Sequence, residues 1–103
     1  MANIKRCTTP TIQYTFRKVA VSDIATAFFT INMDGEKVLE KDLSEAAVGE
    51  NTLAWTLSQD ETLRLTESWV TMQCNWVTEA GLRGASDVET VYMDINLKNE
   101  VIA

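Results

Sequence analysis

Residues 12–17 read Ile12-Gln13-Tyr14-Thr15-Phe16-Arg17, and residues 91–97 read Val91-Tyr92-Met93-Asp94-Ile95-Asn96-Leu97. In both stretches apolar and polar side chains alternate with a period of two, which places every second side chain on one face of a β-strand. Similar short segments recur along the chain and are separated by turns. The pattern predicts an all-β domain of antiparallel strands, each with one buried face and one face in water.

Two further strands are predicted on either side of a tight turn. The first covers residues 24–33 and places Phe28 on the face opposite to its apolar side chains, which are Ala25, Ala27, Phe29 and Ile31. Asp34-Gly35 follows, a pair that favours a type I′ hairpin turn because both central residues need positive φ. The returning strand, residues 36–43, is densely charged, which is typical of an edge strand protected from pairing with other chains.

The second half of the chain predicts strands over 52–57, 67–78 and 86–98. Ser58 and Glu61 have the spacing of a capping box and predict one short helical turn after the first of these strands. The side chains expected to face inward are Leu53, Trp55, Leu57, Val70, Met72, Cys74, Trp76, Val91, Met93, Ile95 and Leu97. About six or seven strands predict a two-sheet sandwich of immunoglobulin type over residues 10–103, with a small barrel as the rival architecture.

Composition bounds the class of protein. The chain has 103 residues, 46% of them hydrophobic, which suits one folded domain. No apolar run approaches the ~18–20 residues of a membrane span. No apolar stretch follows the basic residues at the N-terminus, so a secretory signal is not expected and synthesis is expected to stay in the cytosol.

The net charge of −6 is distributed unevenly. Residues 1–22 carry +4, from Lys5, Arg6, Arg17 and Lys18, whereas the remainder carries −10. One interpretation is a soluble acidic domain with a slightly basic leader over residues 1–9. The other is a basic, mobile arm that docks on the acidic face of a neighbouring copy. The acidic body argues against nucleic acid as a partner, since phosphate neutralisation needs Lys and Arg.

The cysteines and the absence of histidine limit the chemistry. Cys74 alternates with apolar residues and is expected in the core, whereas Cys7 lies in the polar leader. A disulfide between them is the alternative, disfavoured in a cytosolic setting. The chain contains no histidine, so no metal-ligand spacing of the His/Cys kind and no Ser-His-Asp or Cys-His arrangement is present.

Carboxylates are the remaining candidates for catalysis. Glu40 with Asp42 and Asp60 with Glu61 are interpreted as solvated charges of an edge strand and a turn. Asp34-Gly35-Glu36 lacks the further acidic ligands of a calcium loop, and no glycine pattern matches a phosphate-binding loop. We therefore expect no enzyme activity, no cofactor and no metal; an enzyme would need an unusual site built from carboxylates alone.

Aromatic residues on the polar faces are the best candidates for contact with a partner. Trp69 and Tyr92 lie on the more polar face of their strands. Three interpretations are open: the two rings pair across strands, they form the centre of a protein interface, or they provide a platform for sugar. The predicted interface residues are Arg6, Arg17, Phe28, Trp69 and Tyr92.

The order of the segments is similar to that of a known family. The chain begins with Thr11-Ile12-Gln13-Tyr14-Thr15-Phe16, continues through the Asp34-Gly35 turn, and then reads Asn51-Thr52-Leu53-Ala54-Trp55-Thr56-Leu57-Ser58-Gln59-Asp60-Glu61-Thr62-Leu63. This order resembles the small β-sandwich proteins encoded in tail and baseplate regions of phages and prophages of Firmicutes, including the N-terminal domain of baseplate upper proteins.

The resemblance implies a non-enzymatic virion component that works through repeated subunit contacts. The expected partners are other virion proteins or copies of the chain itself, in a homo-oligomeric assembly, with no nucleic acid and no membrane. The expected location is the virion, after synthesis in the bacterial cytoplasm. The alternative function is a β-sandwich module that binds carbohydrate or another component of a cell surface.

Overall fold

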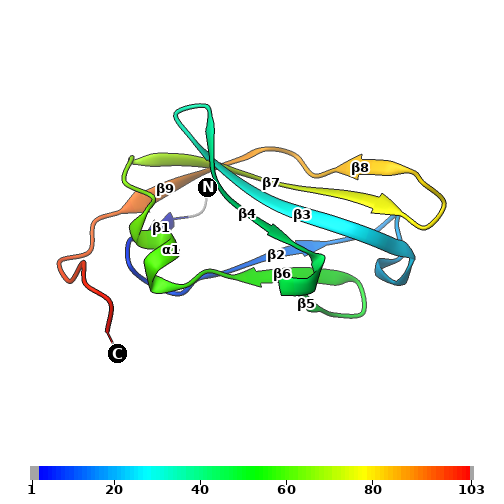
Figure 1. Ribbon diagram of the computed structural model, residues 1–103, viewed down its shortest axis with the longest axis horizontal. Helices are drawn as coiled ribbons and strands as arrows, with labels where there is room; N and C mark the ends of the chain where they lie inside the picture. Colours follow the sequence, from blue (N-terminus) through cyan, green and yellow to red (C-terminus); the bar gives the residue numbers. More distant parts are fainter. Residues whose placement is uncertain (1–2, 103) are drawn as a thin grey trace.

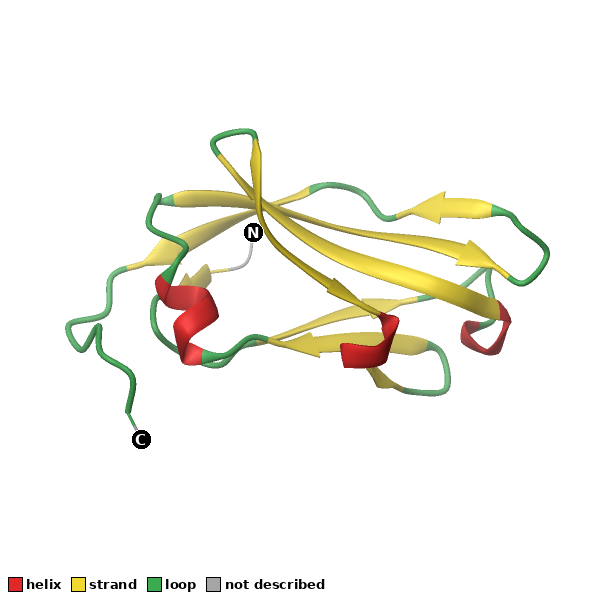
Figure 2. Cartoon of the chain, in the orientation of Figure 1, coloured by secondary structure: helices red, strands yellow, loops and turns green. Residues whose placement is uncertain are grey.

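Two β-sheets face each other across an apolar interior in the computed structural model, which describes residues 3–102 (Figures 1 and 2). The large sheet has the strand order β1-β9-β7-β3-β4, with β8 paired to the end of β7. Its strands are β1 (Asn3–Lys5), β3 (Ile24–Met33), β4 (Glu36–Asp42), β7 (Trp69–Thr78), β8 (Arg83–Ala85) and β9 (Glu89–Asp94). The small sheet, in the order β2-β6-β5, contains β2 (Thr11–Thr15), β5 (Ala47–Val48) and β6 (Thr52–Thr56).

Three short helical segments connect the sheets. They are the 3-10 turns η1 (Val21–Asp23) and η2 (Leu43–Glu45) and the five-residue helix α1 (Gln59–Leu63). The Ser58 hydroxyl accepts a hydrogen bond from the Glu61 backbone N–H, and the Glu61 carboxylate accepts one from the Ser58 N–H. The predicted capping box is therefore confirmed.

The connectivity confirms the predicted immunoglobulin-like sandwich. Strands β2, β6 and β5 occupy the positions of strands B, E and D, and β3, β4, β7 and β9 occupy those of C, C′, F and G. The first strand differs, because β1 joins the large sheet and runs parallel to β9. Consequently no strand of the described chain lies beside the outer edge of β2.

The hairpin of β3 and β4 forms as the sequence predicts. Asp34 and Gly35 have φ values of 55° and 78°, so both central residues are in the left-handed region that a type I′ turn requires. Strand β4 ends the large sheet, which confirms its predicted place at an edge. A register shift between Ile31 and Asn32 adds a bulge to this edge.

Aromatic rings fill the interior between the sheets. Trp55 of β6 stacks on Phe29 of β3 with ring centroids 5.4 Å apart, and Tyr14 of β2 contacts both rings. The Trp55 indole N–H donates to the carbonyl of Asp42 at 2.9 Å and so links the two sheets. The predicted inward positions of Leu53, Trp55, Leu57, Val70, Met72, Cys74, Val91 and Met93 are confirmed, since all are buried.

The structure corrects the prediction of a separate leader at residues 1–9. Asn3–Lys5 forms β1, paired with Tyr92, Met93 and Asp94, and Ile4 and Cys7 are buried. Residues 3–9 are therefore part of the sandwich; residues 1 and 2 lie outside the described part. Cys7 and Cys74 are both buried as free thiols, so the alternative disulfide is not formed.

The last strand is shorter than predicted. It ends at Asp94, and the inward positions predicted for Ile95 and Leu97 are wrong, since their exposed fractions are 69% and 99%. The Asp94 carboxylate accepts a hydrogen bond from the Ile95 N–H, and the Asn96 amide donates to the Arg6 carbonyl. These bonds hold the chain after Asp94 outside the sheet. Ala25 is also exposed, because a register shift at the start of β3 turns Ile24 inward instead.

Candidate interaction face

The surface of β3 and β7 that points away from the small sheet is the candidate functional site, and we call it the outer face. Its residues alternate with the buried ones and pair across the two strands. They are Thr26, Phe28, Thr30 and Asn32 of β3 and Trp69, Thr71, Gln73, Asn75 and Val77 of β7. None of these nine residues is charged, in a chain where 23% of residues are.

An aromatic pair stands at one end of the outer face. Trp69 and Tyr92 are directly opposite each other on β7 and β9, with ring centroids 5.0 Å apart and ring planes at 64°. Trp69 keeps 48% of its surface exposed. Phe28, 42% exposed, lies further along the face opposite Asn75. The predicted cross-strand pair therefore forms and still presents apolar surface to solvent.

Charged residues surround the outer face instead of crossing it. On the β4 side, Glu40 accepts a hydrogen bond from the Thr30 hydroxyl at 3.3 Å and pairs with Lys37 at 3.1 Å. On the opposite side, Arg83 of β8 donates to the Asn75 side chain at 3.4 Å. Depletion of charge from the centre of a surface, with charged residues at its rim, is the distribution found in protein–protein interfaces.

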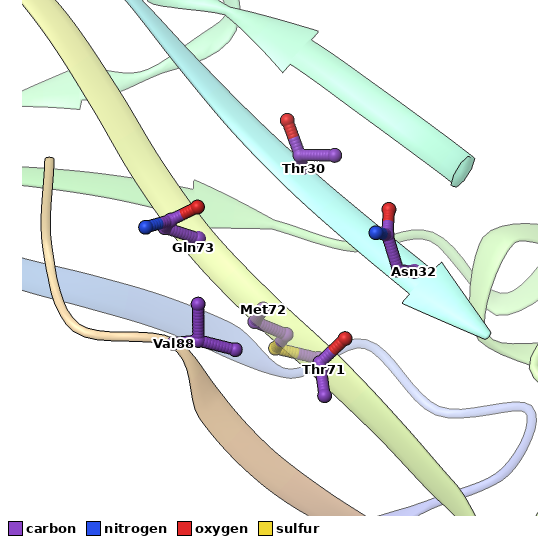
Figure 3. Close-up of a pocket in the computed structure, with 6 residues that line it drawn as sticks. All are labelled: Thr30, Asn32, Thr71, Met72, Gln73 and Val88. Carbon is purple, nitrogen blue, oxygen red and sulfur yellow. The ribbon is translucent and has the colours of Figure 1, made fainter. Parts of the chain in front are cut away.

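Two hollows mark the outer face. The first lies between β3 and β7 at Thr30, Asn32, Thr71 and Gln73 and has a volume of about 50 Å³ (Figure 3). The second, of about 180 Å³, is bordered by residues that include Phe28, Val77 and Arg83. Pockets for small organic ligands measure roughly 300–1,000 Å³, so these hollows suit individual side chains or water better than a whole ligand.

Asn32 adds an unsatisfied polar atom to the first hollow. Its Oδ1 atom is shielded from solvent and has no hydrogen-bond partner among the described residues. A shielded acceptor without a donor costs free energy, roughly 1–3 kcal/mol. A donor from a partner placed in the hollow would remove that cost.

The structure brings three of the five predicted interface residues onto one surface, since Phe28, Trp69 and Tyr92 all belong to the outward faces of adjacent strands of the large sheet. Arg6 instead donates to the carbonyls of Leu65 and Thr66 at 3.0 and 2.9 Å. It thereby fixes the connection between α1 and β7.

Arg17 also lies away from the outer face. It is exposed just beyond β2, beside an apolar groove of about 330 Å³.

The polar residues of the outer face are not among the predicted interface residues. Thr30, Asn32, Thr71 and Gln73 carry no chemistry that marks them individually. A signal was nevertheless present, because residues 24–33 and 68–78 contain no charged residue at all, including on the alternate positions that point to water. A solvated sheet face normally carries charges there, so the absence of charge from two neighbouring strands distinguishes this face from the rest of the surface.

Two ionisable residues outside the outer face, Glu61 and Cys74, have surroundings that shift their pKa. Glu61 and Lys41 form an ion pair at 3.0 Å and both are mostly shielded. Burial raises the pKa of Glu61, but the backbone N–H of Ser58 and the Lys41 ammonium group outweigh burial and lower it. Burial raises the pKa of the Cys74 thiol to about 11, so this thiol is protonated at neutral pH.

Residues 3–102 contain neither a metal-binding cluster nor a membrane-spanning helix. No group of three or more His, Cys, Asp or Glu side chains in this range is placed to hold a metal ion. Nor does any helix in the same range have the length and apolar character needed to cross a bilayer.

No protein-family model matches the chain, and no curated protein is significantly similar to it.

Proposed function

We propose that this protein is a non-enzymatic structural or assembly protein that works through protein–protein contacts made by the outer face. The observation that carries the proposal is the uncharged surface of β3 and β7, on which Phe28 and Trp69 are exposed and Trp69 packs against the half-buried Tyr92 of β9. Such a surface gains free energy when it is covered, because apolar area leaves water and no charge has to be desolvated.

The energetic centre of the contact is the aromatic end of the face. Fully burying a large apolar side chain contributes about 1.5–3 kcal/mol, and interface hot spots are enriched in Trp and Tyr. Trp69 is already held against Tyr92, so little side-chain freedom is lost when a partner covers it. Phe28 provides a second anchor, separated from the first by the hollow at Asn32.

The partner class follows from the resemblance of the sequence to small tail and baseplate β-sandwich proteins of Firmicutes phages and prophages. We propose that the outer face contacts other virion proteins, or copies of the chain, within a tail or baseplate, and that the protein resides in the virion. The uncharged face supports a permanent contact, because surfaces that stay in water usually carry charge.

Carbohydrate binding is the alternative function, favoured by the half-exposed ring of Trp69. A sugar platform normally uses the flat faces of rings. The Trp69 and Tyr92 rings are inclined at 64°, so the edge of one ring meets the other and the pair is not a flat platform. The protein-contact proposal accounts for the whole uncharged face, including Asn32 and Gln73, whereas a sugar site accounts for Trp69 alone.

Co-sedimentation tests the proposal against this alternative. Purified protein is mixed with tail particles from a phage of the kind that the sequence resembles, and in parallel with cell-wall polysaccharide. We expect co-sedimentation with the particles, weakened ~10-fold or more by Trp69→Ala or Phe28→Ser, as for hot-spot residues. The control is Val48→Ser, at an exposed apolar residue of the small sheet.

Three outcomes contradict the proposal. Failure to bind particles is one, equal binding by all variants is the second, and retention on polysaccharide that Trp69→Ala alone abolishes is the third. The last outcome would establish the sugar-binding function in its place.

A further inference from the structure

Strand β2 has a free edge with unpaired backbone groups. The Leu57 N–H donates to the Pro10 carbonyl and the Phe16 N–H donates to the Asn51 carbonyl, at 2.9 and 2.8 Å. Because hydrogen-bonded pairs alternate along an antiparallel ladder, the N–H and C=O groups of Thr11, Gln13 and Thr15 point away from β6. No described strand pairs with them.

This edge lacks the protection that the other sheet carries. The edge strand β4 bears Glu36, Lys37, Glu40 and Lys41 and contains a bulge, features that discourage pairing with another chain. The sequence of β2 is Thr-Ile-Gln-Tyr-Thr, with no charge, and its register with β6 is unbroken. Such an edge is a template for the addition of a strand.

The same chain exposes a segment with the matching pattern, residues 95–102, which we call the tail. Ile95, Leu97, Val101 and Ile102 are all exposed. The alternation of Ile95, Leu97, Asn99 and Val101 has the same period as that of Ile12, Tyr14 and Phe16, the inward residues of β2 and its continuation. The tail is fastened near its two ends, by the hydrogen bond from the Asn96 amide to the Arg6 carbonyl and by two hydrogen bonds between the Gln59 side chain and the Ile102 backbone.

We propose that the tail of one copy adds as a strand to the free edge of β2 in a second copy. In a parallel register with Ile95 beside Ile12, Leu97 lies beside Tyr14, so the apolar patterns coincide at these two positions, and Asn99 lies beside Phe16. The same register places the Glu100 carboxylate beside Arg17, an exposed cation that follows β2.

A groove at the end of β2 completes the docking surface. It has a volume of about 330 Å³, with Phe16, Val19 and Trp76 as its apolar lining and Arg17 and Lys18 at its rim. In the proposed register Val101 lies beside Lys18, next to this groove. The added strand occupies the position that strand A holds beside strand B in an immunoglobulin sandwich, which is vacant here because β1 joins the large sheet.

The contact joins two different surfaces, so it is head-to-tail. A dimer formed in this way still has one free edge and one free tail, and addition of copies continues unless the rotation closes a ring. The docking surface lies on the small sheet, opposite to the outer face of the proposed function. The Trp69→Ala variant is therefore expected to self-associate like the wild type, so the two proposals can fail independently.

Two variants test the two sides of the contact separately, one by altering the edge of β2 and the other by altering the tail. Gln13→Pro removes an N–H that points away from β6, so the edge loses a donor while the pairing with β6 keeps its bonds. Leu97→Asp combined with Val101→Asp places charges on exposed tail positions and leaves the fold contacts of Asn96 unchanged. Gln13→Ala, which retains the N–H, is the matched control, and circular dichroism verifies that each variant folds.

The mass of each sample is measured by light scattering after size exclusion. Protein concentrations extend to ~1 mM, which is the weak end of specific association. The wild type and Gln13→Ala are expected to exceed the monomer mass as concentration rises. Each contact variant alone is expected to remain a monomer. An equimolar mixture of the two is expected to form a dimer and stop there, because one partner supplies the intact tail and the other the intact edge.

Any of three results overturns the proposal. The first is a wild type that remains monomeric at the highest concentration. The second is a tail variant that still dimerises, which would indicate pairing of β2 with β2. The third is a mixture of the two variants that forms no dimer.

Discussion

Trp69 and Tyr92 oppose each other across β7 and β9 with their ring centroids 5.0 Å apart, and they form the aromatic end of the uncharged outer face. Edge-to-face aromatic pairs contribute about 0.5–1.5 kcal/mol beyond their burial. A double-mutant cycle of Trp69→Ala and Tyr92→Ala, measured by urea unfolding, is expected to give a coupling energy in this range.

The control for that cycle is Trp69→Ala combined with Phe28→Ala. Phe28 pairs with Asn75, six positions from Trp69 along β7, which at 3.3–3.4 Å per residue is about 20 Å. Substitutions this far apart are expected to be additive. Coupling in the control pair, or none between Trp69 and Tyr92, contradicts the geometry.

Gly84 of β8 is expected to tolerate no side chain. A Cβ atom at this position would lie 2.5 Å from the Trp76 indole ring, which packs edge-on against Phe16 at 4.9 Å. Gly84→Ala is therefore expected to lower the free energy of unfolding by about 1–3 kcal/mol, as for overpacking. Adding Trp76→Leu makes room, so Gly84→Ala should cost less in that background; an equal cost in both would show that Trp76 is not the obstacle.

Arg6 and Arg17 are expected to differ although both are basic residues of the N-terminal part. Arg6 makes two hydrogen bonds to the carbonyls of Leu65 and Thr66. Its loss in Arg6→Ala is expected to cost about 1.5–3 kcal/mol, the range for hydrogen bonds to charged groups. Arg17→Ala, at an exposed position, should change the stability of the monomer by less than about 0.5 kcal/mol. Chemical denaturation in dilute solution measures both, and equal effects would argue against the role of Arg6.

Acid is expected to weaken the contact of Glu61 with Ser58 and Lys41. Hydrogen bonds from Ser58 and the nearby Lys41 ammonium group lower the pKa of Glu61 in the folded chain from its ordinary value of 4.5. The ionised carboxylate therefore stabilises the fold above that value, and this stabilisation is lost as the pH falls through the folded pKa. The difference in unfolding free energy between wild type and Glu61→Gln should shrink from neutral pH toward about pH 3. A difference that does not vary with pH would contradict this prediction.

Local signals predicted most of the fold. The Asp34-Gly35 turn and the Ser58–Glu61 capping box each depend on residues close together in sequence, and both form as expected. The side chains of β6 and β7 that face the core were predicted from the alternation of apolar and polar residues, because both strands are long enough to show a period of two. These features needed no knowledge of the rest of the chain.

Features that depend on distant segments were not predictable in this way. The three residues of β1 are too few to show a period, and their partner Tyr92 lies near the other end of the chain. The alternation of Ile95 and Leu97 continues that of Val91 and Met93, but the sequence does not show where the opposing layer ends. The period therefore predicted a buried strand where the structure has an exposed tail.

The candidate site was predicted in part. Phe28, Trp69 and Tyr92 were predicted because each is an aromatic residue on the polar face of its strand. The structure places all three on one sheet surface. That Asn32 and Gln73 lie between them follows from the pairing of β3 with β7, which sequence periodicity does not specify. Arg6 and Arg17 are both basic, so the sequence does not distinguish them. The structural role of Arg6 is visible only in its hydrogen bonds to the carbonyls of Leu65 and Thr66.

Fluorine NMR measures whether a partner covers the outer face. The chain has three tryptophans, of which Trp55 is buried and Trp69 is half-exposed. The protein is labelled with 5-fluorotryptophan, and Trp69→Phe assigns the Trp69 resonance. When unlabelled tail particles are added, we expect the Trp69 resonance to shift and to lose its solvent isotope effect, while the Trp55 resonance keeps its chemical shift. A particle-bound protein whose Trp69 resonance still reports contact with water would contradict coverage of the outer face.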